Sequence, residues 1–326
     1  MSELGIIVSA MVPVLVVTGL GALLRRVGWL REAADGSLLT LAVNVLTPCL
    51  IFDKVLASRS LADPRNVLWG PLSGFVISVL SIGASLLAAQ LLRRRPVALD
   101  SSEAAQVEAQ QRSRRSFALA TGLQNYGYFP LPLALSLYGD ETAAVLFAHN
   151  LGVEVALWTV GIAVLARASW RGAAKRLLSA PVLSILCATA LNLVLPRDAV
   201  PAAVRGSIGM IGAAAVPVGL LLIGATMADH GRQVFGRGSA RVVLLACALR
   251  LGALPTLYWA ARLVLTPTAE LSHVFALQAA MPAAVMPIVL SKHYGGDSLT
   301  ALRVVFGTTL GSLVTLPLWI HFMSGS

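Results

Sequence analysis

The chain alternates between long apolar runs and short polar segments. Each run is about as long as the roughly 20-residue helix that crosses a bilayer. The ten runs cover residues 4–24, 36–56, 67–92, 116–138, 143–166, 177–195, 207–228, 240–265, 272–291 and 298–320. Because backbone polar groups cannot stay unpaired in lipid, runs of this length must be helical. The pattern predicts an all-α polytopic membrane protein with ten transmembrane helices.

The basic residues between these runs gather on one side. If the N-terminus lies outside the cytoplasm, the cytoplasmic loops hold 17 lysines and arginines and the opposite loops hold 6. Loops rich in lysine and arginine stay in the cytoplasm during insertion. We therefore expect both termini on the non-cytoplasmic side.

Composition excludes several classes of protein. Hydrophobic residues make up 57% of the chain and charged residues 12%, whereas soluble domains are about 25% charged. The net charge of +10 does not indicate nucleic-acid binding, because the arginines lie in short clusters between apolar runs and aromatic residues are only 6%. The three cysteines lie in separate runs without metal-ligand spacing, so we expect neither a disulfide nor a metal site. No catalytic motif is found, so we expect neither an enzyme nor a cofactor.

Landmarks in the first half of the chain recur in the second half. Residues 117–119 (Phe-Ala-Leu) and 138–140 (Tyr-Gly-Asp) return as residues 275–277 and 294–297 (Tyr-Gly-Gly-Asp). This offset places five runs in each copy, and an odd number inverts the second copy relative to the first. Inverted repeats are typical of secondary transporters. We predict a first repeat at 1–166, a short cytoplasmic linker at 167–176 and a second repeat at 177–326.

The fourth and ninth runs are the most interrupted by helix-disfavouring residues. Pro130 and Pro132 lie in the fourth run, and Pro282 and Pro287 lie in the ninth. A proline removes one backbone donor and frees a carbonyl one turn earlier. A single proline in a membrane helix is often only a kink, but clusters at matching places of two repeats favour real breaks. The freed helix ends would direct partial positive charge at the gap, which suits an anion.

Three segments resemble the auxin efflux carrier family. Residues 125–132 (Asn-Tyr-Gly-Tyr-Phe-Pro-Leu-Pro) resemble its fourth helix, 278–288 its ninth and 212–225 its seventh. The resemblance implies that helices one, two, six and seven form a scaffold and that the other six form a moving transport domain. The broken helices four and nine would cross near the binding site. Plant members export the auxin anion, and bacterial members are described as malate or malonate permeases.

The resemblance places the substrate site at and beside this crossing. Many relatives have glycine where Pro130 stands and proline where Gln124 stands, so the resemblance does not identify the substrate. The predicted substrate-binding residues are Gln124, Asn125, Tyr126, Gly127, Pro130, Pro132, Asn150, Met281, Pro282, Met286 and Pro287.

Three ionisable residues lie inside the apolar runs, where charge is costly and often functional. Glu154 and Arg250 admit two interpretations. Either they form a buried ion pair or separate satisfied polar contacts that hold the transport domain together, or Arg250 neutralises the substrate while Glu154 couples transport to protons. Arg303 lies close enough to the predicted cytoplasmic end of its run to reach the surface.

Together these features predict a secondary transporter that moves a small organic anion across the inner (plasma) membrane by alternating access. The anion would be a mono- or dicarboxylate or an auxin-like acid. The expected partners are this anion and the lipid bilayer, with a homodimer as an open possibility and no nucleic acid. The alternative is a membrane-embedded sensor or receptor for an organic acid with the same fold.

Overall fold

The computed structural model describes residues 3–92, 103–166, 178–194, 200–234 and 239–324, and the regular elements within them are all helices. Seven helical spans in this part of the chain are long and apolar enough to cross a membrane. They are Leu4–Arg26, Glu32–Leu56, Pro64–Leu92, Asp140–Leu165, Ala202–Asp229, Ser239–Leu265 and Ser298–Ser324. The prediction of an all-α, multi-pass membrane protein is therefore confirmed.

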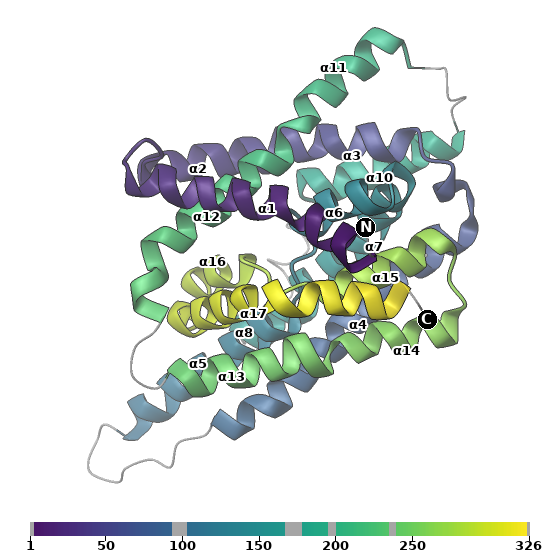
Figure 1. Ribbon diagram of the computed structural model, residues 1–326. Helices are drawn as coiled ribbons and strands as arrows, with labels where there is room; N and C mark the ends of the chain where they lie inside the picture. The colour runs from purple at the N-terminus through teal and green to yellow at the C-terminus, as the bar shows by residue number, and fades with distance from the viewer. Residues whose placement is uncertain (1–2, 93–102, 167–177, 195–199, 235–238, 325–326) are drawn as a thin grey trace.

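The helices lie in two groups (Figure 1). The first group packs α1 against α12, and α3 against α10 and α11. Its members are α1 (Glu3–Arg26), α2 (Glu32–Leu41), the π-helical turn η1 (Ala42–Leu46), α3 (Thr47–Leu56), α10 (Ala180–Val194), α11 (Ala202–Ala213) and α12 (Ala215–Val234).

The second group is built around α4, which packs on α5 and α7, and around α17, which packs on α5, α13, α15 and α16. Its helices are α4 (Pro64–Ala88), α5 (Glu103–Gly122), α6 (Pro130–Leu137), α7 (Asp140–Ala156), α8 (Ile162–Ala166), α13 (Ser239–Cys247), α14 (Pro255–Leu265), α15 (Ala269–Ala280), α16 (Met286–His293) and α17 (Ser298–Ser324). Its short elements are η2 (Ser60–Ala62), η3 (Ala89–Leu92), and the π-helical turns η4 (Leu157–Gly161) and η6 (Ala248–Ala253).

Glycines allow the helices within each group to touch backbone to backbone. A Cβ on Gly224 of α12 would lie 1.9 Å from the carbonyl oxygen of Thr18 on α1. A Cβ on Gly152 of α7 would lie 1.8 Å from the carbonyl oxygen of Pro71 on α4. Lipid chains are as apolar as leucine, so helix association in a bilayer depends on this kind of close packing.

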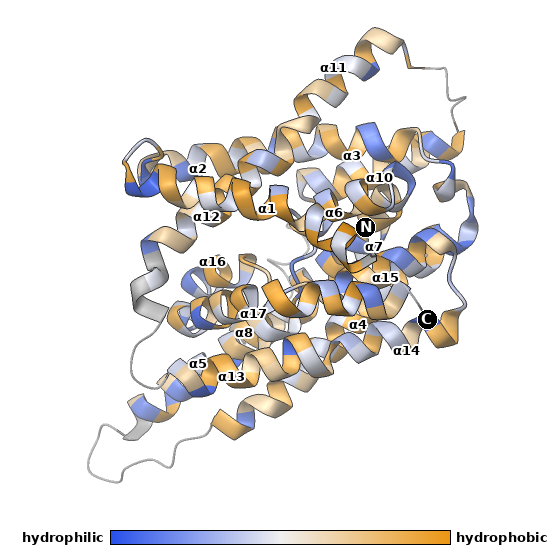
Figure 2. Ribbon diagram, in the orientation of Figure 1, coloured by the Kyte–Doolittle hydropathy of each residue, from blue (hydrophilic) through white to orange (hydrophobic). Residues whose placement is uncertain are grey.

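The surface of the molecule is apolar over most of its helices. Figure 2 shows hydrophobic residues along both groups and hydrophilic residues concentrated near helix ends. Large side chains such as Val16, Leu244 and Val314 are exposed, whereas the hydroxyls of Ser78 and Ser81 on α4 are buried. A chain that exposes valine and buries serine is suited to a lipid rather than an aqueous surrounding.

The other three predicted runs are shorter or interrupted. The run 177–195 corresponds to α10, which has 15 residues, so its length alone does not establish that it spans the membrane. The run 116–138 contains the end of α5 and all of α6, and the run 272–291 contains most of α15 and nearly all of α16. The predicted linker at 167–176 lies outside the described residues.

Candidate functional site

The interrupted helices meet through their backbones. Between α5 and α6, and between α15 and α16, the chain is extended for a few residues. The backbone N–H of Asn125 donates to the carbonyl of Pro282 at 2.7 Å, and that of Ala284 donates to the carbonyl of Leu123 at 2.9 Å. This short antiparallel pairing of residues 123–125 with residues 282–284 is called the crossing below. It satisfies backbone groups that a broken helix would otherwise leave bare.

Prolines account for the position of each break. Pro130 and Pro287 lie in the first turns of α6 and α16, where the missing N–H is not needed. Met281, the residue before Pro282, has extended backbone angles and ends α15, because the residue before a proline avoids the helical region. Two helix N-termini and two helix C-termini therefore face the crossing. The N-termini of α6 and α16 carry partial positive charge, which favours an anion between them.

Four buried amide side chains surround the crossing. Gln124 Nε2 donates to the hydroxyl of Tyr258 at 2.6 Å. Asn150 Nδ2 donates to the carbonyl of Tyr126 at 2.7 Å, and Gln278 Nε2 donates to Asn150 Oδ1 at 3.2 Å. The side-chain amide of Asn125 is 8% exposed and has no hydrogen-bond partner among the described residues. Both of its N–H donors are therefore open to a bound molecule, whereas each of the other three amides already uses one N–H on the protein.

Glu154 is satisfied by two donors and does not pair with Arg250. Its carboxylate accepts from the Tyr126 hydroxyl at 2.9 Å and from Trp158 Nε1 at 2.8 Å. No ion pair joins it to Arg250 within the described residues. The ion-pair alternative is therefore wrong, and Glu154 instead has the separate polar contacts that the other structural alternative expected. The reason is local, because Trp158 lies one turn after Glu154 on the same helix and Tyr126 comes from the break that α7 packs against.

Arg250 is fully buried and lacks any partner in the described structure. Its exposure is 0%, and none of its three guanidinium nitrogens forms a hydrogen bond there. It lies in η6, which packs against α5 and α17, and it interacts electrostatically with Tyr258, the residue that accepts from Gln124. A positive charge thus lies next to Tyr258, the partner of Gln124, and its donors are unused within the described structure.

The remaining predicted residues divide into two sets. Gly127, Pro132 and Met286 are half-buried at the crossing, whereas Pro130, Met281, Pro282 and Pro287 are buried there. Met281 packs in the main apolar core, which is an ordinary structural role. Arg303 lies near the start of α17, and its buried Nε has no hydrogen-bond partner within the described structure. No hydrogen bond or ion pair among the described residues ties it to the crossing.

Three further residues support the crossing and were missed. Thr308 Oγ1 of α17 accepts from the backbone N–H of Ala283 at 3.1 Å. The hydroxyl of Tyr258 on α14 accepts a hydrogen bond from the side chain of Gln124. The ring of Tyr128 lies over Gly219 of α12, where a Cβ would be 2.3 Å away, so the crossing also touches the first group. No sequence signal marks Thr308 or Tyr258, because each is a single polar residue in an apolar helix.

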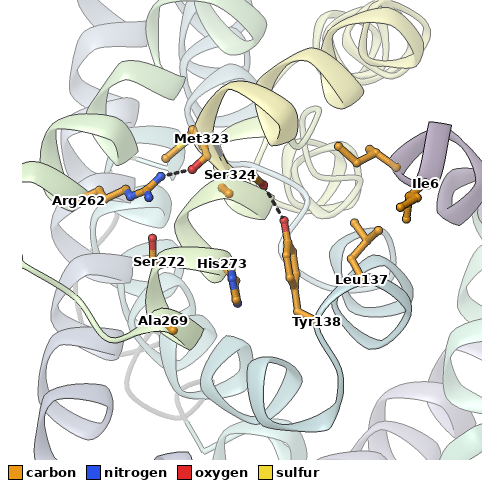
Figure 3. Close-up of a pocket in the computed structure, with 11 residues that line it drawn as sticks. Ile6, Leu137, Tyr138, Arg262, Ala269, Ser272, His273, Met323 and Ser324 are labelled. Atoms are coloured by element: carbon orange, nitrogen blue, oxygen red, sulfur yellow. Dashed lines mark hydrogen bonds between the residues drawn. The ribbon is translucent and has the colours of Figure 1, made fainter. Parts of the chain in front are cut away.

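A cavity of about 350 Å³ lies at the far ends of the same half-helices (Figure 3). It is lined by the beginnings of α1 and α15, the end of α6 with the adjoining Tyr138, and the ends of α14 and α17. Tyr138 stacks flat on His273, with ring centroids 4.0 Å apart. Arg262 donates to the carbonyl of Met323. The cavity is thus lined by an arginine, a histidine, a tyrosine and two serines together with apolar side chains.

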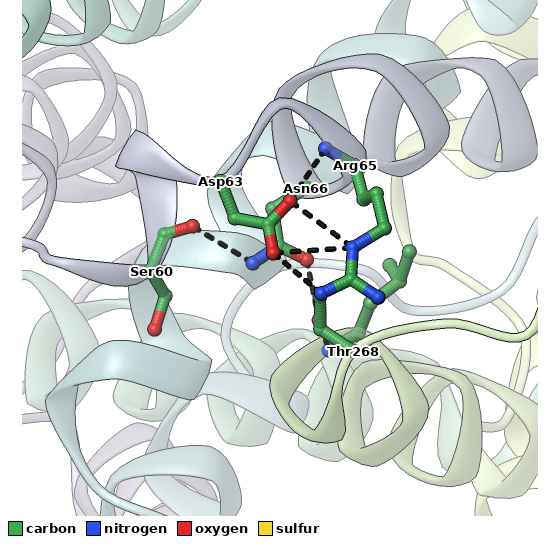
Figure 4. Close-up of polar contacts among 6 residues, drawn as sticks. Ser60, Asp63, Arg65, Asn66 and Thr268 are labelled. Atoms are coloured by element: carbon green, nitrogen blue, oxygen red, sulfur yellow. Dashed lines mark hydrogen bonds and ion pairs between the residues drawn. The ribbon is translucent and has the colours of Figure 1, made fainter.

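A polar network fixes the N-terminus of α15 (Figure 4). Asn66 Nδ2 donates to the carbonyl of Ser60 at 2.8 Å, and Thr268 Oγ1 donates to Asn66 Oδ1 at 2.5 Å. Thr268 also caps α15 by accepting from Leu271 N. Nearby, hydrogen bonds from the side chain and backbone of Arg65 hold the pKa of Asp63 below its usual value. The network links the start of α4 to the half-helix that leads into the crossing.

Two comparisons with known proteins bear on this arrangement. The sequence profile of the family described as "Membrane transport protein" matches residues 6–176 and again residues 172–320. An "Uncharacterized transporter" of Methanothermobacter thermautotrophicus is 26% identical over 307 residues, which cover 94% of this chain and 95% of that protein.

Proposed function

Because the chain belongs to the membrane transport protein family, the auxin efflux carrier-like family that its motifs resemble, we propose that it is a secondary carrier for a small organic anion. The substrate is a mono- or dicarboxylate or an auxin-like acid, and the membrane is the inner membrane of the cell. Family membership and the related transporter point to transport rather than to enzymatic catalysis.

The unpartnered guanidinium of Arg250 carries this proposal. A buried charge without a partner costs several kcal/mol, and natural proteins tolerate such a cost mainly at functional sites. A carboxylate at the crossing would pair with Arg250, accept from the Asn125 amide and lie near the N-termini of α6 and α16. All three features favour negative charge. Glu154 has its own donors and would serve to position Tyr126 rather than to bind the anion.

The movement we propose is alternating access between two inverted five-helix repeats. The two family matches divide the chain close to the predicted linker, and the crossing joins one break from each half in antiparallel pairing. The first helix group would act as the scaffold and the second as the transport domain. Tyr128 against Gly219 is a contact between them, and it would change when the second group moves.

Transport by the purified protein tests the proposal. We expect liposomes containing the protein to take up at least one of radiolabelled malonate, malate and indole-3-acetate faster than protein-free liposomes. Arg250→Met should abolish most of this uptake, because it removes the positive charge that is proposed to pair with the substrate. Uptake that never exceeds the protein-free control for a wider panel of organic acids would refute the proposed function.

A further inference from the structure

The cavity of Figure 3 lies beside two of the half-helices that lead to the crossing. Its floor is made by α6 and α15, the two half-helices whose other ends form the crossing. α6 has 8 residues and α15 has 12, so at about 1.5 Å per residue the far ends of these helices lie roughly 12–18 Å from the ends that adjoin the crossing. The start of α1 and the end of α17 also line it, which places it on the side predicted to be non-cytoplasmic.

The cavity also lies between the two helix groups. Ile6 and Ile7 of α1 come from the first group, and the other lining residues come from the second. A molecule that leaves the crossing toward this face would therefore pass between the parts that are proposed to move against each other. This position distinguishes the cavity from a void inside one rigid group.

Its chemistry is that of a site for an amphipathic anion. Figure 3 shows Arg262, Ser272 and His273 toward one end, and Ile6 and Leu137 toward the other. None of the 11 lining residues is acidic. The bond to the Met323 carbonyl holds the guanidinium of Arg262 in place, so less freedom is lost when it binds a ligand.

His273 is oriented by its neighbours. Its ring is stacked on Tyr138, and its Nδ1 lies 3.5 Å from Thr142 Oγ1. Within the described residues no group is hydrogen-bonded to its Nε2. Tyr138 is itself held by a 3.2 Å hydrogen bond between its hydroxyl and Ser324 Oγ. One ring nitrogen of a fixed imidazole therefore stays available for a ligand.

We propose that this cavity is a second binding site for the transported molecule, specific for a monocarboxylate with an apolar body. The carboxylate lies between Arg262 and His273 Nε2, and the apolar body packs against Ile7, Leu137 and Met323. The anion occupies this outer site before it enters the crossing from the non-cytoplasmic side, or after it leaves. The inference rests on the proposed function, and it adds a site and a class of substrate.

Transport measured separately from each face tests this inference. Right-side-out and inverted membrane vesicles would be prepared with wild-type protein, Arg262→Gln and Ser272→Leu, and the uptake of radiolabelled indole-3-acetate would be measured. Both substitutions are expected to raise KM at least fivefold from the outer face and less than twofold from the cytoplasmic face. Arg65→Gln is the matched control. It removes a largely exposed arginine on the same face, paired with Asp63, and should leave both KM values unchanged.

The outcomes separate the possible failures. Equal KM changes from both faces, or no change in either Arg262→Gln or Ser272→Leu, would overturn the outer site while leaving the proposed function intact. Wild-type vesicles that take up no organic acid from either face would overturn the proposed function, and the outer site with it. Thermal unfolding of each variant identifies any loss of transport that comes from misfolding. If one variant is misfolded, the KM values of the other decide whether the outer site exists.

A lipid headgroup could supply the same negative charge. The KM values of wild type and Arg262→Gln would therefore be compared in liposomes of phosphatidylcholine alone and in liposomes that also contain phosphatidylglycerol. We expect the KM of Arg262→Gln to exceed that of the wild type in both kinds of liposome. A difference that requires phosphatidylglycerol would show that the cavity holds a lipid phosphate and would overturn the proposal.

Discussion

Arg250→Met separates binding from stability. Arg250 is fully buried without a protein partner in the described structure, so methionine removes an uncompensated charge and keeps an unbranched side chain of similar length. A buried charge that lacks a partner costs several kcal/mol. Thermal stability should therefore stay the same or rise. Substrate affinity should fall, because a hydrogen bond to a charged group contributes about 1.5–3 kcal/mol, which is roughly tenfold to a hundredfold in Kd.

The assay combines uptake with ligand-induced stabilisation. A ligand at 100 times its Kd raises the free energy of unfolding by about 2.7 kcal/mol, so the wild type should melt at higher temperature with substrate, and Arg250→Met should show little shift. Arg241→Met is the control, since Arg241 lies on the same span with an exposed side chain. It should behave as the wild type in uptake.

Glu154→Gln completes the test. It removes one of the acceptors that Tyr126 and Trp158 use, so the melting temperature should fall by itself. Because the two residues share no partner, adding Arg250→Met should not restore it, and the two effects on stability should add to within about 0.5 kcal/mol. If Arg250→Met lowers the melting temperature and adding Glu154→Gln raises it again, the reasoning is refuted and the two residues form an ion pair.

Three further predictions concern the crossing and the topology. Asn125→Ala should weaken substrate binding by about 1–3 kcal/mol without changing the melting temperature; an unchanged KM would remove Asn125 from the site. Gly219→Ala should slow uptake, because its Cβ would lie 2.3 Å from the Tyr128 ring. Gly206→Ala, with nothing within 4 Å, is its control, and equal rates in both variants would contradict the contact. In a background whose three native cysteines are replaced by alanine, Ser326→Cys should react with a membrane-impermeant maleimide in intact cells; labelling only after permeabilisation would disprove the predicted orientation.

The helices and their interruptions were predictable from the sequence because their causes are local. Apolar runs indicated the seven long spans, and prolines indicated that the chain breaks before α6 and near α16. The amides Asn125 and Gln124 were predicted for the site because the family resemblance places the site at the break in which they lie. The family resemblance was confirmed as well, and it depended on these same proline-bearing segments.

The tertiary structure decided which residues the buried polar side chains contact. Glu154 and Arg250 were both visible as ionisable residues in apolar runs, but the sequence could not tell that Tyr126 and Trp158 would satisfy the carboxylate. Thr308 looked like any threonine in an apolar helix until α17 brought it to the backbone of Ala283. The outer cavity was equally hidden, because it combines the ends of five helices from both halves of the chain.

The sequence by itself therefore determined which segments are helical, where two of them break and which charges lie at depth. A proline acts on its own backbone, and an apolar run responds to lipid wherever the rest of the chain lies. The tertiary structure alone decided that Asn125 pairs with Pro282 and that Arg250 has no hydrogen-bond partner among the described residues. Those outcomes depend on distances between residues far apart in the chain, and only the packing of the helices fixes such distances.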